Sequence, residues 1–415
     1  MQYHIQLPDN KSLRIREMIW SWVRCGKVLP VSSADCRDIA VTHRALTTIS
    51  ASVETRLIAS LQSGKTSDVP VTIDVEDCGA AYRFLMPILA ATPGTWMLTG
   101  TLRLLERPIL PLVEVLRGIG ADIKRVEEGW LIRGSSFHPV VETQNFASLQ
   151  IDATQSSQMA SALVLSAPLL GLRILHLTTP DIPSLSYLRM TLACTRDWPV
   201  KIPGVEVPET PIGASGDWSA AIFWFAYARL HPECSFILSP LSLESIQGDC
   251  VISQWFRQLN LSVACRDAKF CVSTTPIVEI AAKPLVETPR LVLDVRDNLD
   301  TVPVMAALAT RLPADITFRN VQNLQYKESD RLHALADQLK PFAEIELSEN
   351  EFRVIGKGGQ LVARAGFDTC HDHRLAMAFL LFGPNATLND TECLQKSYPD
   401  LLRQMRELER LSLLW

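Results

Sequence analysis

Five consecutive polar residues, at positions 327–331, are the sharpest candidate for chemistry in this 415-residue chain. They read Lys-Glu-Ser-Asp-Arg and are followed by leucines at helical spacing, at positions 332, 335 and 339. If one helix includes the cluster, then Lys327, Glu328 and Arg331 share a face. Two cations around a carboxylate would bind an anionic substrate while Glu328 exchanges a proton. The alternative is a solvated helix face with a local ion pair, which periodicity alone favours.

Small polar or basic residues also precede other predicted helices. A helix N-terminus offers free N–H groups and the positive end of the helix dipole, so it binds anions well. Each example alone is typical of an ordinary N-cap, whereas their repetition beside basic residues favours a polyanionic ligand. The examples are at residues 11–12, 77–79, 156–158, 300, 372 and 396–397.

Cysteine and histidine offer two further possibilities. The run Cys-His-Asp-His at residues 370–373 suggests metal binding, but no other group with ligand spacing supports it, so we expect no metal ion. Cys78 lacks a histidine partner near it in sequence, which favours a small buried thiol over a nucleophile. The ten cysteines include no C-x-x-C pair, as is typical of reduced thiols in a cytoplasmic protein.

Composition limits the class of protein. The formal net charge is −5 and 47% of residues are hydrophobic, which indicates a large core and argues against nucleic-acid binding. The longest apolar-rich stretch, residues 84–98, contains Pro87, Pro93 and Gly94, so we expect no membrane span. The length predicts at least two domains, and the Pro-rich residues 202–217 are the best candidate linker.

A repeated pattern indicates how these residues are positioned. Three times, a helical stretch leads to a β-branched residue, an aromatic residue seven positions later and a second β-branched residue nine positions later, with polar turn residues between. This pattern predicts a helix, a strand, a turn and a strand, used at least three times, although chance similarity among such junctions is the alternative. The sets are Ile123, Trp130 and Ile132; Val263, Phe270 and Val272; and Ile345, Phe352 and Val354.

Read in order, the motifs resemble those of the 5-enolpyruvylshikimate-3-phosphate (EPSP) synthase family, the 3-phosphoshikimate 1-carboxyvinyltransferases. The resemblance covers about residues 5–405. It fits poorly at residues 27–72, and the segment at residues 200–215 is short for the family, as though a hairpin were trimmed. Ala80 and Phe84 stand where the family has Thr and Pro, which leaves sensitivity to analogues such as glyphosate open. The matching segments are D-N-K-S-L-R-I-R at 9–16, D-C-G-A-A-Y-R at 77–83, R-L-L-E-R-P-I at 103–109, S-S-Q at 156–158, N-L-Q-Y-K-E-S-D-R at 323–331, D-H-R-L-A-M at 372–377 and K-S-Y-P-D at 396–400.

The resemblance implies an α/β fold: a two-domain inside-out α/β barrel in which each domain has three βαββαβ repeats with the helices packed inside. Residues 11–214 would form the domain on the shikimate-phosphate side. Residues 1–10 and 215–415 would form the second domain, which carries the catalytic Asp and the K-E-x-D-R cluster. The substrates would bind in a cleft between the two domains.

The resemblance also implies the reaction, in which the enolpyruvyl group of phosphoenolpyruvate moves to the 5-hydroxyl of shikimate 3-phosphate and phosphate is released. The implied catalytic residues are Asp300 as base, Glu328 as acid and Lys327 in the proton shuttle. The implied phosphoenolpyruvate ligands are Lys11, Gly79, Arg107, Gln158, Arg331, Arg374 and Lys396. The implied shikimate 3-phosphate ligands are Lys11, Ser12, Arg16, Ser156, Ser157, Gln158, Ser184, Tyr187, Asp300, Asn323 and Lys327. Arg83 is a further cation of these motifs.

Two alternatives stay open at this point. One is transfer of the enolpyruvyl group to UDP-N-acetylglucosamine, although the segment before Arg107 lacks the Cys that such enzymes normally carry. The other is a non-catalytic binding paralogue. The resemblance requires no cofactor, and we expect a cytoplasmic monomer whose partners are its two small substrates.

Overall fold

The computed structural model describes residues 1–63, 69–135, 148–209, 216–266, 275–285, 289–358 and 364–412. The chain divides into two compact units. Unit 1 comprises Met1–Lys11, Ala34–Cys36 and Gly213–Trp415, and unit 2 comprises Ser12–Ser33 and Arg37–Ile212. The predicted boundary between residues 214 and 215 lies outside the described residues.

The described part of unit 1 contains three sheets. Two have four strands, in the orders β1-β8-β10-β9 and β11-β12-β14-β13, and the third pairs β15 with β16. The strands are β1 (Gln2–Gln6), β8 (Ser235–Ser239), β9 (Leu261–Arg266), β10 (Ile277–Ala282), β11 (Arg290–Asp294), β12 (Asp315–Arg319), β13 (Ala343–Leu347), β14 (Glu351–Gly356), β15 (Ala365–Phe367) and β16 (Ala386–Leu388).

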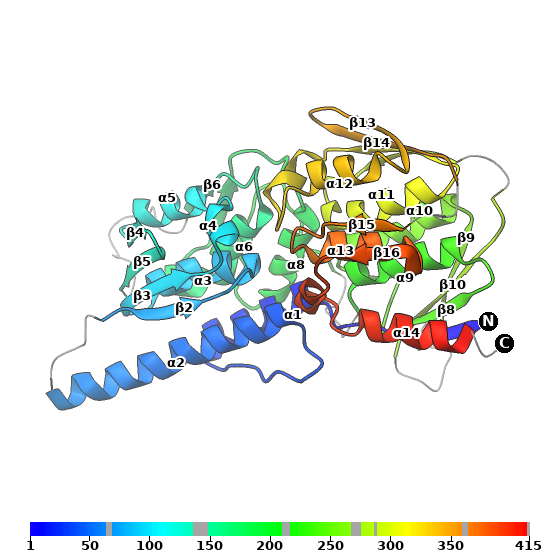
Figure 1. Cartoon of the computed structure of the whole chain (residues 1–415). Coiled ribbons are helices and arrows are strands. Elements are labelled where there is room, and N and C mark those ends of the chain that lie inside the picture. Colours follow the sequence, from blue (N-terminus) through cyan, green and yellow to red (C-terminus); the bar gives the residue numbers. More distant parts are fainter. Residues whose placement is uncertain are drawn as a thin grey trace. The chain divides into compact units, whose positions relative to one another are not determined.

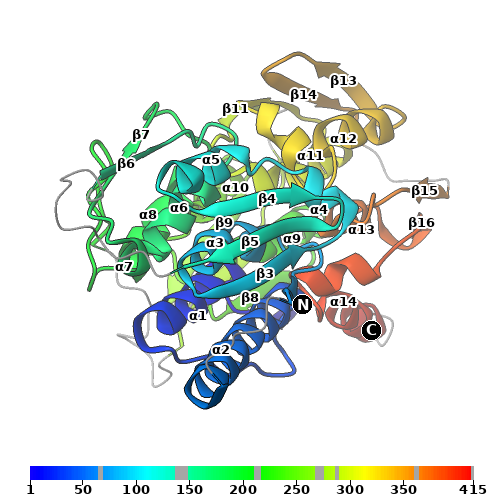
Figure 2. The ribbon, with the colours of Figure 1, turned by 90° about the vertical axis from the view of Figure 1, so that its left-hand side faces the viewer.

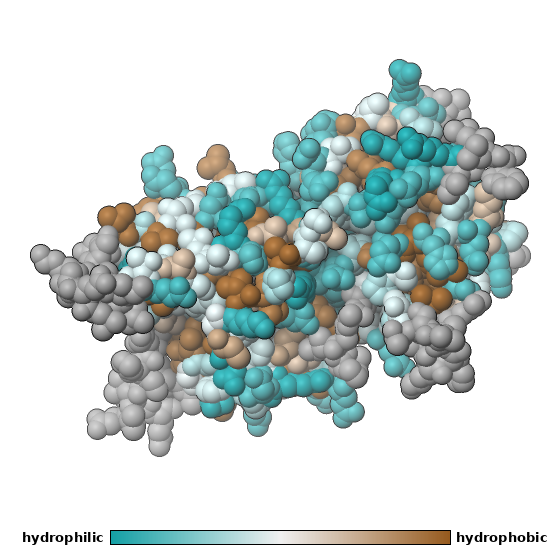
Figure 3. Space-filling view, turned by 90° about the horizontal axis from the view of Figure 1, so that it is seen from below, coloured by the Kyte–Doolittle hydropathy of each residue, from teal (hydrophilic) through white to brown (hydrophobic). Residues whose placement is uncertain are grey.

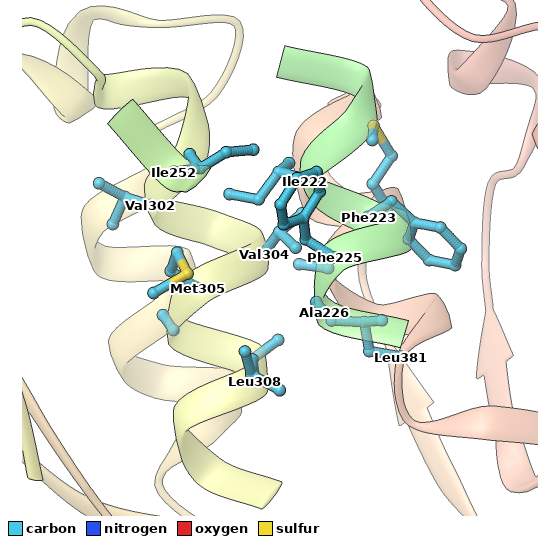
Figure 4. Close-up of a cluster of buried hydrophobic side chains, with 14 of the residues drawn as sticks. Ile222, Phe223, Phe225, Ala226, Ile252, Val302, Val304, Met305, Leu308 and Leu381 are labelled. Carbon is cyan, nitrogen blue, oxygen red and sulfur yellow. The ribbon is translucent and has the colours of Figure 1, made fainter. Parts of the chain in front are cut away.

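Three almost completely buried helices form the centre of unit 1: α9 (Trp218–Leu230), α11 (Val302–Arg311) and α13 (His373–Leu380). They are hydrophobic on nearly all sides, as a helix must be when it is surrounded by protein. Figure 4 shows Ile222 and Phe225 of α9 and Met305 and Leu308 of α11 in this core. The other helices are α10 (Ile252–Gln258), α12 (Arg331–Leu339) and α14 (Leu401–Ser412), with 3-10 turns η1 (Gly248–Val251), η3 (Leu299–Thr301), η4 (Gln322–Tyr326), η5 (Gly383–Asn385) and η6 (Glu392–Lys396).

The described part of unit 2 contains a four-stranded sheet, in the order β2-β3-β5-β4, and a parallel pair of β6 with β7. Figure 2 shows β4, β5 and β3 side by side. Helices α3, α6 and α8 supply most of the buried helical residues. The strands are β2 (Val71–Asp74), β3 (Gly94–Thr99), β4 (Asp122–Val126), β5 (Gly129–Gly134), β6 (Ser148–Ile151) and β7 (Ile174–Leu177), and the helices are α1 (Lys11–Cys25), α2 (Arg37–Ser63), α3 (Gly79–Ala91), α4 (Leu102–Glu106), α5 (Leu110–Gly118), α6 (Ser157–Leu165), α7 (Ala167–Leu170) and α8 (Leu185–Cys194).

The α/β class predicted from the sequence is confirmed. All three four-stranded sheets share one topology, in which the first two strands are parallel and each later pair is antiparallel. Residues 27–72, where the family motifs fit poorly, are largely occupied by the single long helix α2 rather than by a further sheet. The two smaller sheets keep only a parallel pair of strands in the described residues.

The predicted strand pattern is confirmed in two of its three copies. Ile123 pairs with Ile132, and Ile345 pairs with Val354, which are the expected partners nine positions apart. The third copy was placed wrongly, because Val263 pairs with Ile280 of β10 instead of with a strand at Val272. Phe270 and Val272 lie outside the described residues. Because β9 ends at Arg266 and β10 begins at Ile277, the connection between these paired strands is longer than the spacing predicted.

An aspartate turn recurs where the first strand of four of these sheets ends. In each case the carboxylate accepts the backbone N–H two residues later, over 2.8 to 3.0 Å. The residue between them is buried, and the chain then enters a central helix: α3, α6, α11 or α13. Such Asx turns give the chain a local alternative to continuing the strand. The four residues are Asp74, Asp152, Asp294 and Asp368.

A glycine ends the third strand of two sheets because the central helix passes too close for a side chain. A Cβ at Gly134 would lie 2.0 Å from the carbonyl oxygen of Thr92, just after α3. A Cβ at Gly356 would lie 1.9 Å from the carbonyl oxygen of Ala309 in α11. The strand end and the helix end are therefore in backbone contact in both units.

Replacing Gly356 by alanine should lower the free energy of unfolding by about 2 kcal/mol or more, because the new methyl group collides with rigid backbone. Urea denaturation measures the loss. The matched control is Gly118→Ala, where nothing lies within 4 Å of the added Cβ, and it should change stability by less than about 1 kcal/mol. Equal stability of the two variants would contradict the close packing.

Candidate active site

A charged cluster occupies the start of the central helices of unit 1. Arg331 is completely buried and donates four hydrogen bonds to three carboxylates. Its Nε lies 2.7 Å from Oδ2 of Asp372, its Nη1 lies 2.8 Å from Oδ1 of Asp300, and its Nη2 lies 2.8 Å from Oε2 of Glu328. A buried guanidinium needs such compensation, since charges are costly to remove from water.

The helix in this region does not begin where the sequence pattern indicated. Asp330 caps α12 by accepting the backbone N–H of His333, so the helix begins at Arg331 and Lys327 and Glu328 precede it. The prediction that all three share one helical face is therefore wrong. Lys327 instead reaches Asp300 directly, with Nζ 3.1 Å from Oδ1. Asp300 is therefore held between two cations, Lys327 and Arg331.

The charges around Asp300 keep it ionised. Burial alone would raise the pKa of its carboxyl, but Lys327, Arg331 and Arg374 together hold the pKa well below its ordinary value. Nη2 of Arg374 lies 3.8 Å from Oδ2 of Asp300. Three carboxylates also hold the pKa of Arg331 above its ordinary value. Asp300 and Arg331 are thus both charged near neutral pH.

Helix α13 begins with residues that complete this cluster. Asp372 is fully buried and accepts hydrogen bonds from the Ser329 hydroxyl and the Arg374 backbone N–H. Arg374 donates to the carbonyl oxygen and the hydroxyl of Ser219. Neither ring nitrogen of His373 has a hydrogen-bond partner in the described residues, although Nδ1 lies 3.8 Å from Oδ1 of Asp372. Burial and the charges of Arg374 and Lys11 hold the pKa of His373 well below its ordinary value, so its ring is neutral.

Unit 2 contains a buried arginine in a contrasting environment. Arg16 is 2% exposed, donates from Nε to the Thr191 hydroxyl over 2.7 Å, and donates from Nη1 to the Ser12 carbonyl over 2.8 Å. Its guanidinium lies 5.1 Å from the ring centre of Phe84 and 5.8 Å from that of Tyr187. Across the described residues no carboxylate pairs with it. Burial lowers the pKa of Arg16 to about 10, so an incoming anion would supply the compensation that Arg331 already has.

A second arginine group lies at the start of α3. A Cβ at Gly79 would come within 2.5 Å of Nη1 of Arg107, so only glycine allows the guanidinium to approach this helix end. The side chain of Arg83 donates to the Pro108 carbonyl over 2.8 Å and to Oε1 of Gln158 over 2.8 Å. Arg83 therefore holds the neighbours of Arg107 and orients Gln158.

The remaining predicted residues lie at element starts or turns. Ser156 caps α6, where Ser157 is the first residue. Ser184 precedes α8 in the left-handed region, with φ of 56°, and Tyr187 follows in that helix. Asn323 belongs to η4, and Lys396 is buried at the end of η6. The sequence predicted a helix directly after Lys396, but α14 begins only at Leu401, because Pro399 disfavours helix before it.

Two other features of the described residues lie apart from this chemistry. A cavity of about 1040 Å³ in unit 1 is lined by residues at the opposite ends of the central helices, including Leu230, Arg311 and Leu380, and by none of the predicted site residues. His, Cys, Asp and Glu side chains in the described ranges form no group that could hold a metal ion. His371 instead contacts Asp390, with Nδ1 2.7 Å from Oδ2, and the Cys78 thiol caps α3.

Sequence reasoning gave no role to Asp372 or Ser219, yet these residues contact Arg331 and Arg374 most closely. The position of Asp372 directly before a helix was visible, but its pairing with Arg331 requires the fold. Ser219 carries no sequence signal beyond its place after Asp217, the N-cap of α9.

Comparisons with known proteins show the family of this chain. The family model for EPSP synthase (3-phosphoshikimate 1-carboxyvinyltransferase) matches residues 4–405. A 3-phosphoshikimate 1-carboxyvinyltransferase from Bacteroides fragilis is 29% identical over 97% of this chain and 94% of that protein. One from Dehalococcoides mccartyi is 27% identical over 97% and 95%. The solved EPSP synthase of Acinetobacter baumannii has a TM-score of 0.64 with 19% identity, over 98% of this chain and 95% of that one.

The family match over nearly the whole chain defines an enzyme of the carboxyvinyltransferase class, which moves enolpyruvyl groups. The chain belongs to the EPSP synthase family, and the acceptor of that family is shikimate 3-phosphate.

No helix in the described residues has both the length and the apolar character needed to cross a membrane. On the face drawn in Figure 3, hydrophobic residues lie in separate groups between hydrophilic ones.

Changing Asp372 to Asn should lower the free energy of unfolding by about 3 kcal/mol, because it leaves the buried Arg331 with a missing partner. Urea denaturation at pH 7 measures the change. The control is Glu407→Gln, which removes an exposed ion pair with Arg403 and should cost less than about 1 kcal/mol. A loss no greater than in the control would show that the buried pair is not needed.

The stability provided by Asp300 should depend on pH in a defined direction. Its folded pKa lies below the unfolded value of about 3.9. The stabilisation is therefore complete above the unfolded pKa and is lost as pH falls through the folded pKa. The difference in unfolding free energy between wild type and Asp300→Asn should be constant from pH 6 to 8 and shrink below about pH 4. A difference that grows on acidification would contradict the low pKa.

Proposed function

We propose that this chain transfers the enolpyruvyl group of phosphoenolpyruvate to the 5-hydroxyl of shikimate 3-phosphate with Asp300, Glu328 and Lys327 as its catalytic residues. The observation that carries the proposal is the hydrogen-bond network around Arg331. Arg331 donates to both Asp300 and Glu328, and Lys327 donates to Asp300. The family match supports the same reaction.

In the proposed mechanism, the 5-oxygen attacks C2 of phosphoenolpyruvate while C3 gains a proton, which gives a tetrahedral intermediate. Loss of a C3 proton and of phosphate then restores the double bond. Asp300 accepts the hydroxyl proton with help from Lys327, and Glu328 supplies the proton to C3. Because three cations surround Asp300, its carboxylate is a weak base. In this proposal Asp300 therefore takes the hydroxyl proton only as negative charge develops on the substrate in the transition state.

Shikimate 3-phosphate is proposed to bind Arg16 through its phosphate. The support is the complete burial of Arg16 without a carboxylate partner in the described residues, beside the Tyr187 ring. A planar guanidinium is well suited to bidentate capture of phosphate. The other proposed ligands are Lys11, Ser12, Ser156, Ser157, Gln158, Ser184, Asp300, Asn323 and Lys327.

Phosphoenolpyruvate carries a carboxylate and a phosphate, so it requires several cations. Arg331 donates four of its five N–H groups to carboxylates. In this proposal these bonds orient Asp300 and Glu328, and the remaining N–H of Nη1 contacts phosphoenolpyruvate. The other proposed ligands are Lys11, Gly79, Arg107, Gln158, Arg374 and Lys396.

We also propose that the enzyme acts in the cytoplasm as a monomer that needs no cofactor. Every cysteine in the described residues is free, as is typical of a reducing compartment. Size-exclusion chromatography with light scattering tests the oligomeric state directly, and a stable dimer would contradict this part of the proposal.

Phosphate release is the assay that tests the reaction. We expect release with phosphoenolpyruvate plus shikimate 3-phosphate and none when UDP-N-acetylglucosamine replaces the acceptor. Phosphate release with phosphoenolpyruvate plus UDP-N-acetylglucosamine, but not with phosphoenolpyruvate plus shikimate 3-phosphate, would overturn the assignment of the acceptor.

Asp300→Ala and Glu328→Gln should each lower kcat by about 100-fold or more, since each removes a proton-transfer group. Circular dichroism checks that the fold is retained. The control is Glu351→Gln, which breaks an exposed ion pair with Arg319 and should leave kcat unchanged. Wild-type turnover in either site variant would remove the role proposed for that residue.

A further inference from the structure

One buried amide outside every motif considered so far makes all the hydrogen bonds that a glutamine side chain can make. Gln247 is 1% exposed and directly precedes the short helix η1. Its Oε1 accepts from Nδ2 of Asn10 over 2.8 Å and from the backbone N–H of Trp218 over 2.9 Å. Its Nε2 donates to Asp217 over 2.8 Å and to Asp249 over 3.1 Å. A backbone donor on one side and two carboxylates on the other fix the orientation of the amide.

One side of Gln247 leads to Arg374. Oδ1 of Asp217 accepts from Gln247 and also from the backbone N–H and hydroxyl of Ser219, over 2.8 and 2.6 Å. The hydroxyl and carbonyl oxygens of Ser219 then accept from the guanidinium of Arg374. Every member of this chain of contacts is buried, so none can exchange its partner for water.

The other side of Gln247 leads to Lys11. Asn10 is 3% exposed and immediately precedes Lys11, the first residue of α1. Asp9 forms a bridge with Gly216, and the Asp217 N–H donates to the Pro8 carbonyl over 3.0 Å, so residues 8–10 and 216–218 run together. Lys11 is also near enough to His373 to lower the pKa of that ring. Gln247 thus joins the backbone that carries Lys11 to the helix end that holds Arg374.

We propose that Gln247 is a positioning residue that fixes Lys11 and Arg374 relative to each other and thereby sets the affinity of the enzyme for phosphoenolpyruvate. This inference rests on the proposed function, in which both cations bind that substrate. Small displacements of groups that hold a substrate have large effects on binding and rate. Gln247 itself contacts no substrate.

Two variants test the inference through steady-state kinetics with each substrate varied in turn. Gln247→Leu removes all four hydrogen bonds, so we expect KM for phosphoenolpyruvate to rise about tenfold or more. We expect KM for shikimate 3-phosphate to rise much less than KM for phosphoenolpyruvate, because Lys11 is only one of its many proposed ligands and Arg374 is not among them. An unchanged KM for phosphoenolpyruvate would overturn the inference.

Gln247→Glu tests whether KM for phosphoenolpyruvate depends on pH through residue 247, which a merely structural role would not predict. The ionised carboxylate would face the two acidic groups that contact this side chain, Asp217 and Asp249, and they should raise its pKa. Protonation restores one donor, so the raised KM for phosphoenolpyruvate should fall between pH 8 and pH 6 relative to wild type. If Gln247→Leu does not fold, this variant decides alone, and a KM ratio that does not change with pH would count against the inference.

Gln404→Leu is the matched control, because Gln404 is also a buried amide of unit 1 and its hydrogen bonds go to Tyr398 and to the Gln6 carbonyl. It should lower stability without a selective change in KM for phosphoenolpyruvate. If Gln247→Leu and Gln404→Leu change KM for phosphoenolpyruvate equally, Gln247 has only a general structural role. Absence of phosphate release by the wild-type enzyme would instead remove the proposed function, and this inference with it.

Discussion

The need to compensate buried positive charge governs the arrangement of this enzyme. Arg331 lies at the start of α12 with no access to water, and Asp372 is equally buried at the start of α13. Their contact fixes the spacing of two helices, which in turn places Asp300, Glu328 and Arg374 around one point. Removing either member would leave the other buried with less compensation for its charge, which is costly in a protein interior.

Arg16 and Arg331 show two solutions to the same problem. Arg331 is neutralised within the protein, whereas Arg16 is held by a hydroxyl, a carbonyl and two aromatic rings. Phe84, which replaces the proline of the family, is one of these rings. Aromatic faces attract a guanidinium without neutralising its charge, so the pocket remains attractive to an anion. In the proposed function, Arg331 therefore organises the catalytic carboxylates, whereas Arg16 binds the substrate.

Local signals in the sequence were sufficient for several features. Polar residues before apolar runs correctly located the starts of α1, α3, α6 and α13, and β-branched spacing located two of the three hairpins. The position of α12 was misjudged because Asp330 is a stronger N-cap than the residues before it. Strand β10 was misplaced because the length of a hairpin connection is not encoded in the spacing of apolar residues alone.

Contacts between distant segments were beyond this reasoning. The pairing of Arg331 with Asp372 spans 41 residues, and that of Gln247 with Asn10 spans 237. Neither pairing produces a periodic pattern in the sequence, since each depends on which segments the fold brings together. The four aspartate turns at Asp74, Asp152, Asp294 and Asp368 did leave a trace, a repeated apolar-Asp pair, but it becomes recognisable only when the equivalent strands are known.

The parallel pairing of β1 with β8 has a consequence for how the chain is made. Strand β1 leaves the ribosome before unit 2, but its partner Ser235–Ser239 follows only after the whole of unit 2. Unit 2 can therefore complete its contacts while the first strand is still unpaired. Unit 1 must close a loop of more than two hundred residues to finish its sheet, a slow step whose entropic cost is lowered when the intervening chain is already compact.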